Sequence, residues 1–486
     1  MSLFTKKSIA ELRAEADAGT LRRSLGPLSL TALGVGSIIG TGIFVLTGTA
    51  ASQYAGPALV LSMVIAAVGC AFAGLCYAEF AAMIPVSGSA YTYAYATMGE
   101  LMAWIIGWDL VLEYALSAAT VAVGWSGYAA SLLRDVGVVL PAQLVAGPGQ
   151  AVALADGTTV QGIFNLPAAL AVVAVSALLV RGINQSARVN TVIVLVKLAV
   201  LVLFVVCGIA YVRPENWTPF IPPNTGEFGA FGWSGVLRGA GVIFFAYIGF
   251  DAVSTAAQEA RNPQRDMPIG ILASLFVCTG LYIAVALVLV GIVSYTELNV
   301  ADPIAVGIDA TGLTWLSPII KLGAILGLLS VMLVVLLGQS RIFYSMSRDG
   351  LLPPVFQRVH PRFRTPHYST MIIGAVVALA SGLLPIAVLS VLTSMGTLLA
   401  FTIACVGVII LRRTSPEIER PFRTPGMPWV PALGALICFV QMLGLPGSAW
   451  ERLVVWLVIG LAIYFLYGRR RAATARAARA TRRAAA

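Results

Sequence analysis

Apolar residues occur along this chain in long runs, and short polar segments separate the runs. A run of about 20 apolar residues can cross a bilayer as an α-helix. The pattern therefore predicts an all-α membrane protein with twelve spans and a tight external turn between the ninth and tenth. The predicted spans are 28–50, 58–84, 101–133, 163–181, 190–212, 236–257, 268–293, 316–340, 367–384, 388–411, 429–446 and 450–468. The third is long, and we expect it to include an interfacial turn.

The composition agrees with membrane insertion and excludes several classes of protein. The chain has 486 residues, of which 59% are hydrophobic and only 11% are charged. An ordinary soluble domain has about 25% charged residues, so a soluble enzyme, a disordered protein and a secreted disulfide module are excluded. The six cysteines lie inside apolar runs, and there are only two histidines. We therefore expect no disulfide framework, no metal site and no cofactor.

The distribution of lysine and arginine predicts the orientation, because cytoplasmic segments carry an excess of both. With the N-terminus inside, 25 of the 31 basic residues fall in cytoplasmic segments and four fall outside. The other two, Lys197 and Lys321, lie within spans. Both termini are therefore predicted to be cytoplasmic, as tails at 1–27 and 469–486. We expect the second tail, which is rich in Arg and Ala, to be disordered against anionic lipid.

Two of the predicted spans contain glycines where a continuous helix would be expected. Four glycines lie between residues 34 and 42, and the sixth span has Gly239, Gly241 and Gly249 before Asp251. These spans open two blocks of five, 28–213 and 236–412, with 429–468 as two extra helices. Matching interruptions in two halves are typical of transporters built from inverted repeats. Gly36 and Gly40 also fit the alternative of a helix-packing motif.

An interrupted helix inside a membrane leaves backbone groups that lipid cannot satisfy, so it is tolerated around a cavity or a polar ligand. N–H groups that open the second half of span 1 would bind a carboxylate. Carbonyls that end the first half of span 6 would bind an ammonium group. Such a site suits the zwitterion of an amino acid. Asp251 is expected either to cap the second half of span 6 or to contact the substrate.

Ionisable residues within the spans are candidates for function. Lys197 lies seven residues from the nearest polar end of span 5. Burial disfavours its charged form, so it can exchange a proton near neutral pH, act as a fixed cation, or serve as a paired structural lysine. On span 3, Asp109 and Glu113 share a helical face, where we expect a structural pairing for Asp109 and a pocket-facing Glu113. Lys321 is expected to reach the membrane surface with its long side chain.

Several motifs carry a resemblance to a known family. Together they cover nearly the whole chain in order: Gly34–Gly48, Trp108–Tyr114, Phe244–Asp251, Asn262–Gly270, Ser340–Pro353 and Arg420–Gly426. They resemble amino acid permeases of the amino acid–polyamine–organocation superfamily, and most closely the bacterial branch of the cationic amino acid transporter family. The resemblance implies a core of five plus five inverted-repeat helices with two more helices.

The resemblance also assigns individual residues. It places the substrate carboxylate at the unwound part of span 1, the substrate amine on carbonyls of span 6, and Met332 opposite the substrate side chain. It matches Lys197 to a lysine that replaces sodium and links transport to protons, and Glu113 to a carboxylate near the pocket. The residues that it assigns to the carboxylate are Ile38, Gly40, Thr41 and Gly42, and those assigned to the amine are Phe245, Ala246 and Ile248.

The leading functional hypothesis is proton-coupled symport of L-amino acids by alternating access across a bacterial plasma membrane. Its alternative is an amino acid exchanger without net proton movement. An enzyme would need a nucleophile–base pair or a metal, and a channel would need a selectivity ring; the sequence contains neither. A receptor would bind substrate without accumulating it. The expected partners are an amino acid, either neutral or cationic, protons, lipid and a possible small membrane subunit, with no nucleic acid.

Overall fold

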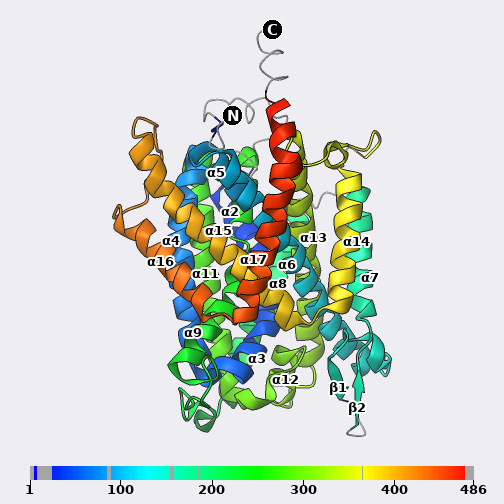
Figure 1. The fold of residues 1–486 in the computed structure, drawn as a ribbon. Coiled ribbons are helices and arrows are strands. Elements are labelled where there is room, and N and C mark those ends of the chain that lie inside the picture. Colours follow the sequence, from blue (N-terminus) through cyan, green and yellow to red (C-terminus); the bar gives the residue numbers. More distant parts are fainter. Residues whose placement is uncertain are drawn as a thin grey trace.

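The structure is a computed structural model that describes residues 5–7, 25–84, 89–153, 158–182, 187–363, 365–474 and 476. It is a bundle of helices whose axes run in roughly the same direction, with a small hairpin at one end (Figure 1). The longer helices are α4 (Leu59–Met83), α6 (Glu100–Asp135), α8 (Ala187–Gly208), α11 (Pro263–Ile292), α13 (Leu316–Arg348), α15 (Ile386–Thr414) and α17 (Gly447–Ile463). Shorter apolar helices are α2 (Pro27–Ile38), α7 (Leu166–Val180), α9 (Gly232–Ile243), α14 (His367–Leu383) and α16 (Trp429–Gly444).

Within the described residues, seven helical stretches are long and apolar enough to cross a membrane. They are Gly42–Met83, Glu100–Asp135, Thr191–Tyr211, Pro263–Ile292, Leu316–Arg348, Ile386–Thr414 and Gly447–Thr474. The first of them joins the second half of predicted span 1 to span 2. The apolar runs are therefore helical, as predicted, whereas the number of twelve spans and the five-plus-five repeat stay predictions.

Short elements lie in the connections and in the two interrupted spans, and the hydrophobic pattern only partly predicts them. These are α3 (Thr47–Ala50), α5 (Ser89–Thr97), α10 (Ala252–Thr255), α12 (Pro303–Asp309), β1 (Ala151–Ala153) and β2 (Thr159–Gln161). The two strands pair antiparallel, with Ala151 opposite Gln161. We did not predict α5, because its polar and aromatic residues give it neither a long apolar run nor a clear apolar stripe.

Two expectations about helix ends are wrong, and one is confirmed. Helix α6 is continuous over Glu100–Asp135, so span 3 contains no interfacial turn. The C-terminal segment is helical from Arg469 to Thr474, so this part of it is not disordered. The rest of the predicted tail, residue 475 and residues 477–486, lies outside the described residues. The tight turn between α14 and α15 is confirmed, because only Leu384 and Pro385 join them.

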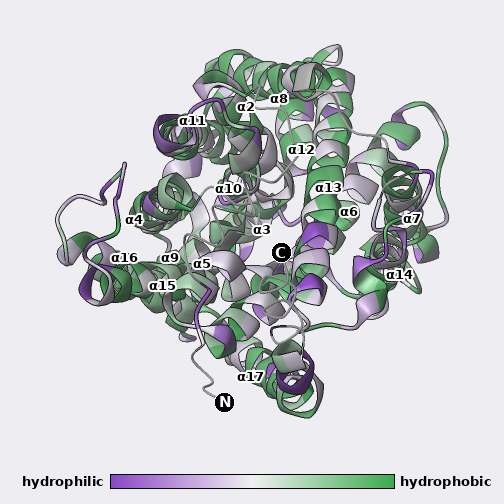
Figure 2. Ribbon diagram, turned by 90° about the horizontal axis from the view of Figure 1, so that it is seen from above, coloured by the Kyte–Doolittle hydropathy of each residue, from purple (hydrophilic) through white to green (hydrophobic). Residues whose placement is uncertain are grey.

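The helices pack in a layout that surrounds the two broken spans. Helix α6 packs against α13, and α11 packs against α2 and α4. Helices α7 and α14 pair at one edge of the bundle, opposite α4 and α16 (Figure 2). Apolar side chains such as Phe276 and Leu466 are exposed on the periphery. An apolar outer surface is expected for a bundle surrounded by lipid, because the lipid tails that it contacts are apolar.

The described ends of the chain meet the same end of the bundle. The ammonium of Lys7 lies 2.7 Å from the carboxylate of Asp349, which also accepts a hydrogen bond from Tyr91. Arg476 forms an ion pair with Glu100 at the start of α6. This placement fits an even number of crossings, and the cytoplasmic orientation of the ends stays a prediction.

Candidate functional site

The first predicted span is interrupted near its middle, as its glycines predict. Helix α2 ends at Ile38, Ile39 is extended, and a π-helical turn begins at Gly42. A Cβ atom on Gly42 would lie 2.2 Å from the Cα of Ala246 in the sixth span. No side chain fits there without moving backbone, so glycine allows the two broken spans to touch.

The sixth span breaks at the same depth. Helix α9 ends at Ile243, one 3-10 turn follows over Phe244–Tyr247, and Ile248 is extended. Gly249 has a φ of 120°, and a Cβ on it would lie 2.7 Å from the carbonyl oxygen of Ser37. Glycine is needed here both for the backbone conformation and for the close approach to α2.

Side chains from two other helices satisfy the backbone that the first break exposes. The hydroxyl of Tyr282 on α11 donates to the carbonyl of Ile38 at 2.9 Å. The ammonium of Lys197 on α8 donates to the carbonyls of Gly36 at 2.8 Å and Ile39 at 3.1 Å. Lys197 is fully buried and forms no ion pair with any residue that the structure describes. The carbonyl end of α2 is thus the partner of a buried cation.

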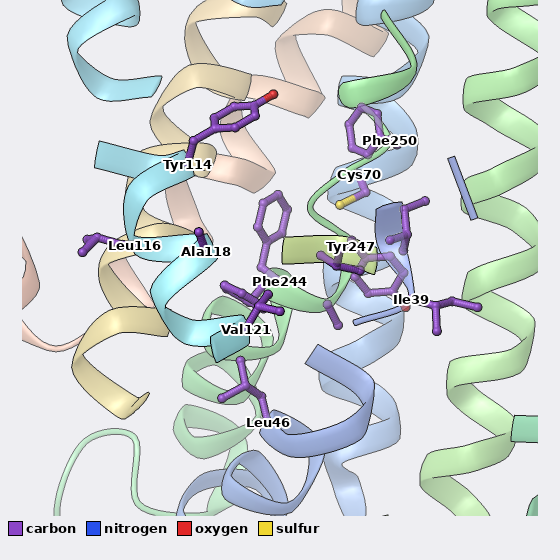
Figure 3. Close-up of a cluster of buried hydrophobic side chains, with 14 of the residues drawn as sticks. Ile39, Leu46, Cys70, Tyr114, Leu116, Ala118, Val121, Phe244, Tyr247 and Phe250 are labelled. Carbon is purple, nitrogen blue, oxygen red and sulfur yellow. The ribbon is translucent and has the colours of Figure 1, made fainter. Parts of the chain in front are cut away.

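A cavity lies between the two breaks. Its walls come from the broken spans, from α6 and from α13, and its volume of about 30 Å³ holds about one water molecule. The lining residues are Ser37, Ile38, Gly40, Thr41, Gly42, Glu113, Tyr114, Ser117, Val121, Phe245, Ile248, Gly249, Asp251, Val331, Val334 and Val335. Figure 3 shows buried apolar side chains of α6 and of the sixth span around the same region, among them Val121 and Phe244.

The structure brings most of the predicted site residues to this cavity. All four residues assigned to the carboxylate line it, as do Phe245, Ile248 and Glu113. Ala246 does not line it and packs against Gly42 instead. Lys197 also lies outside the lining, behind α2. The substrate contacts assigned to these residues stay predictions.

Met332 does not lie on the wall of this cavity, and its assignment opposite the substrate side chain stays a prediction. Met332 is fully buried and absent from the cavity wall, whereas Val331, Val334 and Val335 of the same helix line it. One step along a helix turns a side chain by about 100°, so an alignment shifted by one residue selects a different face. A Cβ on Gly40 would lie 3.3 Å from Val331, which confirms that this face of α13 meets the break.

The capping role of Asp251 is also not what the structure shows. Asp251 sits at the N-cap of α10 without a side-chain capping bond. Its carboxylate accepts a hydrogen bond from the hydroxyl of Tyr114 at 3.2 Å, across the cavity. Asp251 therefore connects the broken sixth span to α6.

The other charged residues within the spans differ in how they are partnered. Both carboxylate oxygens of Asp109 and Oε2 of Glu113 are buried without a hydrogen-bond partner among the described residues. The expected structural pairing of Asp109 is therefore absent from this part of the chain. Lys321 does not reach out to solvent, because its buried ammonium lies 2.7 Å from Asp135 and 3.8 Å from Asp309.

Several lining residues were not predicted from the sequence. Val121 follows Glu113 by eight residues, so helical spacing places it on the same face of α6 as Glu113 and Ser117. That signal could have found it. The valines of α13 carry no such signal, because residues 322–338 of that helix are almost entirely apolar.

The family model described as amino acid permease matches residues 25–466. The chain belongs to the amino acid permease family. It is therefore a multi-pass membrane protein, and its relatives are named as transporters or permeases rather than enzymes.

Individual relatives show how broad this family is. The permease is 47% identical to the methylthioribose transporter of Bacillus subtilis over 469 residues, which cover 96% of this chain and 98% of that protein. It is also 47% identical to a branched-chain amino acid permease of the same organism, again over 96% and 98% of the two chains. A vacuolar cationic amino acid transporter of Arabidopsis thaliana is 38% identical, over 86% of this chain and 68% of its own.

The match includes every element that forms the cavity. Residues 25–466 contain both breaks, Lys197 and the lining residues of α6 and α13. The predicted membership of the permease superfamily is confirmed, with cationic amino acid transporters among the more distant relatives.

Proposed function

We propose that the permease is a secondary active transporter that couples the uptake of L-amino acids to protons by alternating access. We place it in a bacterial plasma membrane with twelve spans, both termini cytoplasmic. The observation that carries the proton coupling is the buried ammonium of Lys197 on the carbonyls of Gly36 and Ile39. No described ion pair neutralises this cation, and its hydrogen bonds go to the end of α2. Protonation of Lys197 and the conformation of the broken helix are therefore linked.

The physical basis of this coupling is the strength of the two bonds. A charged ammonium forms stronger hydrogen bonds to carbonyls than a neutral amine does. Loss of the proton therefore weakens the hold of α8 on the carbonyl end of α2. Since α2 also provides part of the cavity wall, the proton on Lys197 biases the opening of the cavity without touching the substrate.

The same geometry supports binding of an amino acid backbone. The segment from Gly40 to Gly42 precedes the second half of span 1, where backbone N–H groups and the helix dipole favour a carboxylate. The segment from Phe245 to Ile248 ends the first half of span 6, where carbonyls favour an ammonium group. Thr41 adds a buried hydroxyl without a partner in the described part of the chain.

The wall of the cavity favours a neutral, branched side chain. Val121, Val331 and Val335 line it, and a hydrophobic pocket gains from burying methyl groups. Two relatives are named as branched-chain amino acid permeases, at 47% and 36% identity. Binding also requires movement, because a volume of about 30 Å³ is too small for any amino acid.

Uptake into proteoliposomes tests this proposal. Labelled isoleucine, alanine and arginine are supplied with and without an inward proton gradient at a clamped membrane potential. We expect accumulation of isoleucine that requires the gradient. Unlabelled methylthioribose is added as a competitor, because one relative at 47% identity is named for it; strong competition would contradict an amino acid as the main substrate.

Lys197→Met tests the role of the lysine, and Lys321→Met is the matched control because Lys321 is equally buried but paired with Asp135. We expect Lys197→Met to lose gradient-driven accumulation and to keep exchange with preloaded isoleucine. Lys321→Met should keep its dependence on the gradient. If the unmodified protein shows only exchange that ignores the gradient, the permease is an exchanger and symport is refuted.

A further inference from the structure

A second cavity lies far from the site just described, at the end of the bundle that we place in the cytoplasm. It has a volume of about 700 Å³ and lies between the first turns of α11 and the connection from α15 to α16. Its polar part is formed by Asn262, Gln264 and Arg265, and its apolar part includes Ile269, Leu272 and Phe422. This cavity shares no lining residue with the first cavity.

The residues that α11 contributes to the two parts follow one another along one face of that helix. Arg265, Ile269, Leu272 and Phe276 are spaced by four, three and four residues, which places them on one side of a helix. Phe276 is 83% exposed, so this stripe continues onto the outer surface of the bundle. An occupant of the cavity would thus have its polar end at Arg265 and its apolar end among the membrane-facing residues.

The charge of the cavity selects an anion. Among the described residues, Arg265 is the only charged one that lines the cavity; it is exposed and forms no ion pair with any of them. A second exposed arginine, Arg423, follows Phe422 in the chain. The nearby Asp266 is buried, and its carboxylate accepts the backbone N–H of Asn262 at 3.2 Å. Its charge is therefore engaged by the first turn of α11 itself.

We propose that this cavity binds an anionic phospholipid, with the phosphate at Arg265 and an acyl chain along Ile269, Leu272 and Phe276. A basic pocket beside membrane helices at the cytoplasmic surface is suited to lipid phosphates. The apolar stripe favours a lipid over a soluble phosphate, because a soluble anion would leave that stripe unfilled. The lipid would bridge α11, which packs on the broken first span, and the α15–α16 connection.

Native mass spectrometry of the full-length protein tests this inference. The protein is titrated with phosphatidylglycerol and with phosphatidylcholine of the same chains. We expect the anionic lipid to be retained more strongly, and Arg265→Gln to weaken its binding about fivefold while phosphatidylcholine binding is unchanged. Arg265→Lys keeps the charge and should keep most of the preference. Arg413→Gln, at another exposed arginine near the end of α15, is the matched control and should change nothing.

The other outcomes overturn the proposal. Equal retention of the two lipids would show that the cavity does not recognise phosphate charge. An equal loss in Arg265→Gln and Arg413→Gln would show diffuse attraction to the basic surface. Displacement of the lipid by glycerol 1-phosphate would indicate a site for a soluble anion, and a dimer mass that replaces lipid binding would indicate a second copy of the chain. None of these readouts depends on transport, so failure of the symport proposal leaves the test intact.

Discussion

At the scale of single residues, contact between the two broken spans depends on the missing side chain of Gly42. We predict that Gly42→Ala abolishes uptake and destabilises the protein by about 1–3 kcal/mol, the usual cost of overpacking. The reason is the 2.2 Å separation between the new Cβ and the Cα of Ala246, which backbone movement alone can relieve. Uptake into proteoliposomes and thermal unfolding in detergent measure the two effects.

Gly280→Ala is the control for this prediction. Gly280 lies in α11, and a Cβ added to it would meet no atom within 4 Å. Because alanine is a better helix former than glycine, this variant should keep full uptake and the same or a slightly higher stability. Normal uptake by Gly42→Ala would mean that the spans do not need to touch during the cycle.

At the scale of elements, a broken helix persists only where neighbouring helices satisfy its ends. Tyr282 of α11 supplies one such bond to the carbonyl of Ile38. We predict that Tyr282→Phe lowers the free energy of unfolding by about 1–3 kcal/mol, because a buried acceptor loses its donor. The same substitution should reduce uptake, since Ile38 lines the cavity.

Tyr211→Phe provides the comparison for the hydroxyl group. Tyr211 is partly exposed in a short turn after α8, and no hydrogen bond of its hydroxyl occurs within the described residues. Thermal unfolding of both variants in the same detergent measures the difference. Equal melting temperatures would contradict the role of Tyr282 in supporting the break.

At the scale of the whole molecule, Glu79 joins three parts of the chain at the proposed cytoplasmic end. It lies on α4, and its carboxylate accepts hydrogen bonds from Arg412 of α15 at 3.0 and 2.6 Å. It also lies 3.4 Å from Arg420 and accepts the backbone N–H of Thr424 at 2.8 Å. The network holds the α15–α16 connection against α4.

We predict that Glu79→Gln destabilises the protein by about 3–5 kcal/mol, because it leaves largely buried arginines without their carboxylate. Glu417→Gln alters an exposed carboxylate of the same connection and should have little effect. Thermal unfolding in lipid nanodiscs measures both variants. A melting temperature of Glu79→Gln equal to that of the unmodified protein would show that this connection does not stabilise the bundle.

The sequence alone determined where the long apolar helices run and where two predicted spans break. Both properties are local: an apolar run of sufficient length must be helical in lipid, and clustered glycines weaken a helix wherever it packs. The residues at the breaks, from Ile38 to Gly42 and from Phe245 to Ile248, can therefore be located from the order of residues along the chain. The family resemblance of the same segments points to the same positions.

Only the tertiary structure decided which side chains meet. The choice of Val331 over Met332, the bond from Tyr114 to Asp251, and the pairing of Lys321 with Asp135 depend on how each helix is rotated about its axis. In the almost entirely apolar part of α13, residues 322–338, no periodicity records that rotation. It is set by packing against neighbours far away in the chain, so a local pattern contains no information about it.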